Sequence, residues 1–250
     1  NVPLDDFGKI TSDYRITQSI PTIKALQEKG CKIVICSHLG RPKDSQDTHF
    51  SLKPVALRLS KLLDQPVVFV NDCVGDQVKS ASNKLQPGEV LLLENLRYYE
   101  EEEANSIEFA QDLVQSTCAE VFVQDGFGVV HRAHTSTEAV AKIIPAVAGL
   151  LLEKEFNTIT EIMNNPKRPL MAIIGGAKIA DKIDIIYKFI KIADIVAIGG
   201  AMANTFLKAQ NLEIGESLFD NEEIEIACDV MRKAREESGK RDFVFYLPQD

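Results

Sequence analysis

Two kinds of hydrophobic pattern alternate along the chain, short continuous apolar runs and longer segments with an apolar residue every three or four positions. The short runs are rich in β-branched residues, which is typical of strands buried on both faces. The longer segments are typical of helices with one buried face. Because the two kinds alternate throughout, the pattern predicts parallel strands joined by right-handed helical connections, an α/β fold.

The patterns place the individual elements as follows. Predicted strands cover 32–36, 67–70, 90–93, 121–124, 170–174, 195–198 and 243–247. Predicted helices cover 16–29, 52–63, 74–85, 106–116, 152–163 and 221–237, and one more ends near Ile192. Gly30 is a helix C-terminal signal, and the polar stretch 43–49 predicts a surface loop. The acidic run Glu100–Glu103 predicts a solvated helix start, since carboxylates favour the positive end of the helix dipole.

The segment 152–166 divides the chain into two parts. It carries apolar residues on one face of a predicted helix and stops at Asn165-Pro166, so we interpret it as a connector. The predicted organisation is a first domain at 1–151, a connecting helix at 152–166 and a second unit at 167–250.

Composition narrows the function classes. The chain has 250 residues with 45% hydrophobic content, enough for a sizeable core, and a net charge of −9. An acidic surface argues against binding to nucleic acid or to an anionic membrane. No apolar run reaches the length of a membrane span. The five cysteines are odd in number and lack CxxC spacing, which favours a reducing cytoplasmic setting without disulfides or a cysteine metal site.

Polar residues follow directly after five of the predicted strands. In open α/β sheets ligands bind beyond the carboxyl ends of the strands, so these segments are predicted to gather at one edge. A single arginine in such a loop is commonplace, but several that converge indicate a small polyanion, because guanidinium groups donate paired hydrogen bonds to phosphate and carboxylate. The first half supplies most of the cationic groups: Arg15, His38, Arg41, Arg97, His131, Arg132 and His134.

The second half carries two glycine pairs, Gly175-Gly176 and Gly199-Gly200, each followed by a predicted helix. Such pairs let the backbone approach a phosphate closely. Lys178 and Lys182 are four residues apart and are predicted to share one helix face, either as phosphate ligands or as two solvated lysines. Neither a P-loop nor a G-x-G-x-x-G sequence occurs, which disfavours both of those nucleotide folds. One half therefore suits a compact anion and the other a nucleotide, as phosphoryl transfer between two small ligands requires.

Several motifs, taken in order, resemble the phosphoglycerate kinase family: SHLGRP, GEVLLLENLR, DGFG with HRAH, GGAKIADKI and IGGAMANTFLKAQ. The resemblance runs from end to end. It implies two Rossmann-like parallel-sheet domains with three layers (αβα), the second incomplete in this chain. It also implies reversible phosphoryl transfer in glycolysis, from 1,3-bisphosphoglycerate to ADP, giving 3-phosphoglycerate and ATP, by a cytoplasmic monomer without nucleic-acid or membrane partners.

The resemblance also assigns residues, position by position. It implies a catalytic pair, Arg15 and Lys178, that neutralises the transferred phosphoryl group. The implied 3-phosphoglycerate ligands are Asn1, Arg15, His38, Arg41, Arg97 and Arg132. The implied nucleotide ligands are Gly176, Ala177, Lys178, Lys182, Gly199 and Gly200. Mg²⁺ is implied together with ATP or ADP, and the aspartate that holds it is expected beyond residue 250.

The chain departs from the family pattern in several ways, and the aspartate that the family has two places before the position of Asn1 is absent. Ala201 stands where the family commonly has a third glycine, and Gly126 replaces a usual alanine. The later strands of the second domain are missing, so we expect a truncated chain. The alternative function is a non-catalytic module that only binds 3-phosphoglycerate. A Rossmann dehydrogenase is a further alternative, and it predicts NADH binding.

Overall fold

The computed structural model of the chain describes residues 1–43 and 47–248, so positions 44–46 of the predicted loop 43–49 lie outside the described residues. The chain divides into two compact units, Asn1–Asn157 and Thr158–Asp250. The division falls inside helix α6 (Leu150–Asn164), within the segment predicted to connect two domains. No helix in the described ranges is long and apolar enough to span a membrane.

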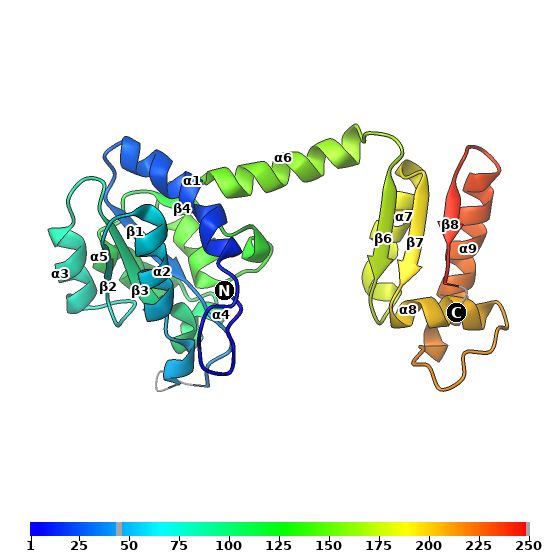
Figure 1. Cartoon of the computed structure of the whole chain (residues 1–250), viewed down its shortest axis with the longest axis horizontal. Coiled ribbons are helices and arrows are strands. Elements are labelled where there is room, and N and C mark those ends of the chain that lie inside the picture. Colours follow the sequence, from blue (N-terminus) through cyan, green and yellow to red (C-terminus); the bar gives the residue numbers. More distant parts are fainter. Residues whose placement is uncertain (44–46, 249–250) are drawn as a thin grey trace. The chain divides into compact units, whose positions relative to one another are not determined.

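The first unit is built on a parallel sheet in the order β1-β3-β2, made of β1 (Ile33–Ser37), β3 (Val90–Asn95) and β2 (Val67–Phe69) (Figure 1). Val90 pairs with both Ile33 and Val67, so the three strands start in register. A separate parallel pair joins β4 (Phe122–Gln124) to β5 (Ala146–Ala148). Strand β5 was not predicted, because its three residues are exposed and carry no alternation.

Strand β3 is buried along its whole length and supplies two cores. Val90 and Leu92 pack with α1 (Tyr14–Glu28) and α2 (Lys53–Leu63) on one face. Leu91 and Leu93 pack with α3 (Asp76–Lys84) and α5 (Ile107–Thr117) on the other. Successive side chains of a strand point to opposite faces, so one strand serves both layers. The predicted αβα arrangement is confirmed for this unit.

The helix ends follow local sequence signals. Gly30, with φ of 70°, donates its N–H to the Gln27 carbonyl at 2.8 Å and ends α1, as predicted. Ser106 caps α5 by accepting a hydrogen bond from the Phe109 N–H at 3.1 Å. Short helices complete the unit: α4 (Glu100–Glu103), η1 (Thr48–Phe50), η2 (Leu96–Tyr98), η3 (Phe127–Val129), η4 (Thr135–Ala139) and η5 (Val140–Lys142).

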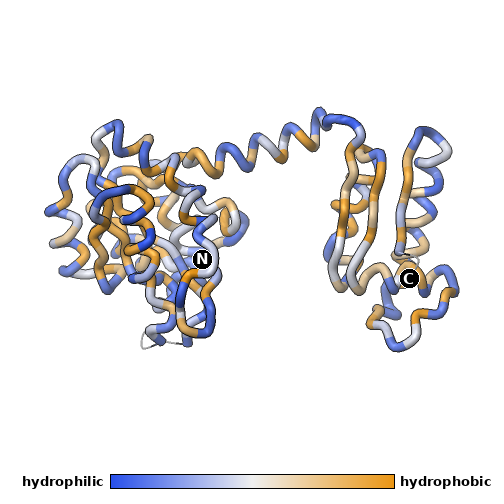
Figure 2. The backbone as a smooth tube through the Cα atoms, viewed as in Figure 1, coloured by the Kyte–Doolittle hydropathy of each residue, from blue (hydrophilic) through white to orange (hydrophobic). Residues whose placement is uncertain are grey.

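The second unit is a parallel sheet of β6 (Met171–Gly175), β7 (Ile195–Gly199) and β8 (Val244–Tyr246). Its helical elements are η6 (Ala180–Lys182), α7 (Ile183–Ile192), α8 (Ala201–Ala209), η7 (Asn221–Glu223) and α9 (Ile224–Ser238). Ala172 and Ile174 of β6 face a core formed with α7, α8 and α9. Figure 2 shows hydrophobic colour along β6 and β7. Met171 and Ile173 point the other way and are 50% and 76% exposed, so β6 is buried on one face only.

Candidate functional site

The ends of β1 and β3 lie side by side in the first unit, because Ser37 pairs with Asn95. Asn95 is fully buried and joins the loop after β1 to the turn after β3. Its side-chain oxygen accepts from the N–H groups of Leu39 (3.0 Å) and Arg97 (3.1 Å). Its amide group donates to the carbonyls of Leu39 (2.7 Å) and Phe50 (3.0 Å). Asn95 therefore holds both polar segments in one fixed arrangement.

Glu94 holds the next segment of the chain. This carboxylate is 4% exposed and accepts hydrogen bonds from the N–H groups of Leu52 (2.7 Å) and Asn95 (2.8 Å) and from the Ser51 hydroxyl (2.7 Å). Leu52 immediately precedes α2, so the carboxylate lies at the positive end of that helix. Neither Glu94 nor Asn95 was predicted to have an individual role, although two polar residues directly after the apolar run 90–93 were a usable signal.

Arg97, Arg15 and Asn1 meet around Gly40. The guanidinium of Arg97 donates from Nη1 to the Gly40 carbonyl at 2.6 Å, and its Nε lies 3.0 Å from a Glu103 carboxylate oxygen. Asn1 accepts from the Gly40 N–H at 3.3 Å through its side-chain oxygen and from Arg15 Nη1 at 2.7 Å through its carbonyl. Three of the predicted substrate ligands are therefore brought together.

Gly40 has φ of 60°, and a Cβ there would lie 2.2 Å from the Phe50 ring. Only glycine fits this turn without displacing that ring. The next residue, Arg41, is exposed and makes no ion pair with the described residues. The structure therefore places Arg41 beside the cluster in sequence but does not engage it there.

His38 is held uncharged by its surroundings. Burial, followed by the positive charges of the amino terminus, Arg97 and Arg132, lowers the pKa of His38 from 6.5 to about 3. Because the charge of Arg132 contributes to that shift, Arg132 belongs to the same cationic neighbourhood. At neutral pH His38 is a neutral hydrogen-bonding group among arginines, which suits a ligand-holding role better than proton transfer at the start of a reaction.

The pKa of His38 predicts a pH dependence of stability. Between pH 3 and 6.5 the unfolded chain binds a proton at this position and the folded chain does not, so folding should strengthen as pH rises through this window. The His38→Gln variant should lack this increase in the free energy of unfolding with pH, which is on the order of 1 kcal/mol after solvent screening. Urea unfolding at several pH values measures it, with the exposed His49→Gln as control. Equal pH slopes for His38→Gln and the wild type would contradict the assignment.

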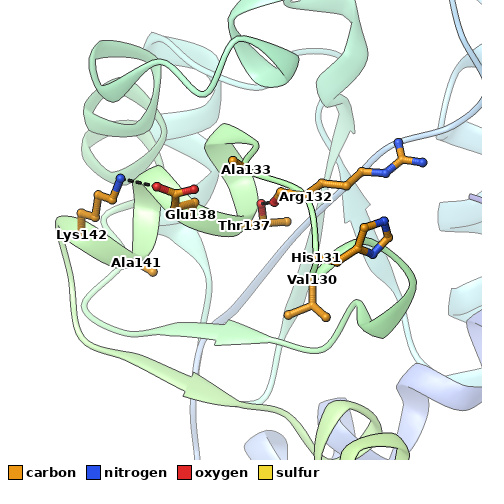
Figure 3. A pocket seen from close by; sticks show the side chains of 8 residues that line it. All are labelled: Val130, His131, Arg132, Ala133, Thr137, Glu138, Ala141 and Lys142. Carbon is orange, nitrogen blue, oxygen red and sulfur yellow. Dashed lines mark hydrogen bonds and ion pairs between the residues drawn. The ribbon is translucent and has the colours of Figure 1, made fainter. Parts of the chain in front are cut away.

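The segment 130–133 lines a cavity of about 360 Å³ (Figure 3). In the figure the Arg132 side chain extends away from Lys142 and Glu138, which bond to each other. The full lining consists of Val130, His131, Arg132, Ala133, Thr137, Glu138, Ala141 and Lys142. His131 and Arg132 are therefore brought to one cavity.

The prediction that the run Glu100–Glu103 is solvated is wrong for Glu102. Its side chain is buried, and its carboxylate accepts from the Ser136 hydroxyl (2.5 Å) and the Ser136 N–H (3.0 Å). It also lies 3.9 Å from Nδ1 of His134. Burial raises the pKa of Glu102, opposed by the two bonds from Ser136. Glu102 thus anchors the end of the segment 131–134, while the other three glutamates of the run are exposed as expected.

In the second unit the two glycine pairs pack against each other. Gly175 pairs with Gly199 at the ends of β6 and β7. Gly200 has φ of 69°, and a Cβ there would lie 2.9 Å from the backbone nitrogen and oxygen of Gly176, so glycine is required. A Cβ on Gly176 would lie 2.9 Å from Cε of Lys182, so the Lys182 side chain crosses this glycine. Four of the predicted nucleotide ligands are therefore brought together.

The prediction that Lys178 shares a helix face with Lys182 is wrong. The helical segment begins at Ala180, with η6, and Lys178 precedes it. Its Nζ lies 3.6 Å from a carboxylate oxygen of Asp220. Ala177 beside it is exposed. The N–H groups that follow, those of Ile179 and Ala180, are bonded to Glu223.

These features define an α/β protein that gathers cationic side chains at the strand ends of one unit and glycine pairs with lysines at the strand ends of the other. A family model described as Phosphoglycerate kinase matches residues 1–250. The chain belongs to the phosphoglycerate kinase family.

Curated relatives and solved structures agree with this membership. The chain is 49% identical over 251 residues to a phosphoglycerate kinase of Rippkaea orientalis and 47% identical over 250 residues to that of Dictyoglomus turgidum. Both matches cover all of this chain and 61% of the relative, so the chain spans about three fifths of its relatives' length. Phosphoglycerate kinase structures from Coxiella burnetii and Pyrococcus horikoshii superpose with TM-scores of 0.78 and 0.76, at 36% and 30% identity. They cover 99% and 98% of this chain and 61% and 62% of theirs.

Proposed function

We propose that this chain belongs to a working phosphoglycerate kinase, which transfers a phosphoryl group reversibly between 1,3-bisphosphoglycerate and ADP to give 3-phosphoglycerate and ATP. The first domain, 1–151, holds 3-phosphoglycerate. The helix 152–166 connects it to the nucleotide-binding part at 167–250. The observation that carries this proposal is the convergence of Arg15, Arg97 and Asn1 around Gly40, next to the neutral His38.

The cluster suits 3-phosphoglycerate for an electrostatic reason. The ligand carries a phosphate and a carboxylate, and Arg15, Arg97 and Arg132 supply permanent positive charge at the strand ends. His38 adds a hydrogen-bonding group without further positive charge, since its pKa is near 3. Asn1 and Arg41 complete the proposed ligand set. Arg41, exposed and adjacent to Gly40, turns to the ligand on binding.

The nucleotide binds in the second unit at Gly176, Ala177, Lys178, Lys182, Gly199 and Gly200. Neither Gly176 nor Gly200 has a side chain of its own, and their backbones pack closely beside the ends of β6 and β7, which supports a phosphate at this edge. Ala201 opens α8 directly after Gly200 and replaces a third glycine. The two lysines neutralise the phosphates.

The proposed reaction needs little proton transfer. In the direction of ATP use, a carboxylate oxygen of 3-phosphoglycerate forms the new bond to the γ-phosphorus while the bond from that phosphorus to the bridging oxygen of ADP breaks. A carboxylate is already ionised at neutral pH, so no general base is required. Catalysis then rests on positioning and charge neutralisation, supplied here by Arg15 and Lys178.

Mg²⁺ accompanies the nucleotide in the proposed reaction. Within the described ranges, no group of three or more acidic, histidine or cysteine side chains could hold a metal ion, so these residues alone do not fit a resident site. We propose that the metal enters with ATP or ADP. We further propose that the protein acts as a cytoplasmic monomer.

Calorimetric titration of the chain with 3-phosphoglycerate, and separately with Mg-ADP, tests the proposal. Binding of both ligands, with turnover in a coupled assay, is the expected result for a phosphoglycerate kinase. Binding of 3-phosphoglycerate without nucleotide binding or turnover would favour the binding-only alternative for this chain. Binding of neither ligand would contradict the proposed function.

A further inference from the structure

A carboxylate from a distant part of the chain occupies the backbone just after Lys178. Glu223 is 5% exposed, and its two oxygens accept from the N–H groups of Ile179 (2.6 Å) and Ala180 (3.1 Å). These N–H groups open the helical segment η6–α7 and have no partner within it. Hydrogen bonds to an ionised group are stronger than neutral ones, so Glu223 fixes this backbone.

Asp220, three residues earlier, faces the side chain of Lys178. One carboxylate oxygen lies 3.6 Å from the lysine Nζ, and the other accepts from the Glu222 N–H at 3.0 Å. The Asp220 N–H donates to the hydroxyl of Thr205, a fully buried residue of α8, at 3.1 Å. The segment 220–223 is therefore tied to α8, which begins at the second glycine pair, and to the loop that follows the first.

We propose that the segment 220–223 sets the position of the loop 176–180, which follows β6 and carries Lys178. Its two carboxylates have opposite effects on nucleotide binding. Glu223 holds the backbone at 179–180 and thereby fixes where the Lys178 side chain leaves the loop. Asp220 holds the Lys178 ammonium while no phosphate is present, and the nucleotide phosphate must displace it. This inference rests on the nucleotide-binding function proposed above.

The arrangement also limits which groups can meet the phosphate. Because Glu223 already occupies the N–H groups of Ile179 and Ala180, these two donors are closed to the ligand. A carboxylate beside them would also repel a phosphate. The ammonium groups of Lys178 and Lys182 therefore hold the phosphate on this side. Because Glu223 positions Lys178, it affects the affinity for the nucleotide directly.

Three variants of the chain separate the two effects from general damage. Glu223→Gln keeps the shape but removes the charge and one acceptor, and should lower the affinity for Mg-ADP about tenfold, equivalent to roughly 1.4 kcal/mol. Asp220→Asn keeps the acceptor for the Glu222 N–H but releases Lys178, and should raise the affinity about two- to threefold. Glu222→Gln, an exposed neighbour, should change nothing. Calorimetry measures the affinities, and circular dichroism checks folding.

Amide NMR supplies a readout that needs no nucleotide. The protons of Ile179 and Ala180 should move upfield in Glu223→Gln, as their bonds to a carboxylate are lost, and stay in place in Glu222→Gln. Unchanged amide shifts, or unchanged affinity in both Glu223→Gln and Asp220→Asn while the wild type binds Mg-ADP, would overturn this inference alone. Reduced affinity in Asp220→Asn would overturn the competing role of Asp220. Absence of Mg-ADP binding by the wild-type chain would overturn the nucleotide function and this inference with it.

Discussion

Replacing Arg97 with alanine should lower the affinity of the chain for 3-phosphoglycerate by roughly 100-fold. The Arg97 side chain is 8% exposed, so its charge acts through little intervening water. The substitution also removes the hydrogen bond to the Gly40 carbonyl and leaves the carboxylate of Glu103 without its cation. Calorimetric titration of wild type and variant with 3-phosphoglycerate measures the change.

Two further variants define what the Arg97 result means. Lys61→Ala removes the same charge from an exposed position on α2 in the same unit and should leave the affinity within about twofold of wild type. Arg97→Lys keeps the charge but cannot reproduce the forked geometry, so its affinity should lie between wild type and alanine. If Arg97→Ala and Lys61→Ala weaken binding equally, net charge rather than the cluster governs affinity.

Replacing Asn95 with alanine should lower the free energy of unfolding of the first unit by roughly 3 kcal/mol. The substitution leaves the N–H groups and carbonyls that Asn95 now joins without partners in a fully buried position. Each unpaired buried group costs about 1–3 kcal/mol, although water entering the space recovers part of this. Urea unfolding followed by circular dichroism measures the difference.

The control is Asn71→Ala, an exposed asparagine whose loss should cost less than about 0.5 kcal/mol. Asn95→Asp keeps the acceptor for the N–H groups of Leu39 and Arg97 but loses both donated bonds and buries a charge. It should therefore also destabilise the unit strongly. A cost below about 1 kcal/mol for Asn95→Ala would show that the loop after β1 is held by other contacts.

Local patterns predicted most of the strands and helices because the hydrophobic periodicity that identifies such an element lies within its own residues. Strand 90–93 was found from four apolar residues, and β3 extends two residues further because Glu94 and Asn95 are satisfied by partners more than 40 residues away. No local signal reports such partners. The exposed strand β5 was missed for the opposite reason, since it has no apolar run and forms only by pairing with β4.

The candidate site was predictable where the strand-end rule applies and not where long-range carboxylates intervene. Arg97 follows β3, so the strand-end rule placed it beside the loop after β1, and the structure brings it to the Gly40 carbonyl. Arg15 lies in α1 and follows no strand, so that rule does not account for its bond to Asn1. Lys178 was placed on a helix because Glu223, 45 positions later, gave no sign that it caps the segment from 179 onward. Glu102 was taken as solvated because Ser136 lies far along the chain. Each of these two errors arose because the side chain or backbone concerned is bonded to a residue distant in the sequence.

Strand β3 has a consequence for how the first unit can change over evolutionary time. Four residues of β3 supply both cores, and the next two, Glu94 and Asn95, hold the loop after β1 and the start of α2. A substitution that repacks either core shifts the strand, and the strand shifts Asn95 and Arg97. Core and loops are therefore not separately mutable, and a lineage can vary its helices freely only while β3 keeps its position.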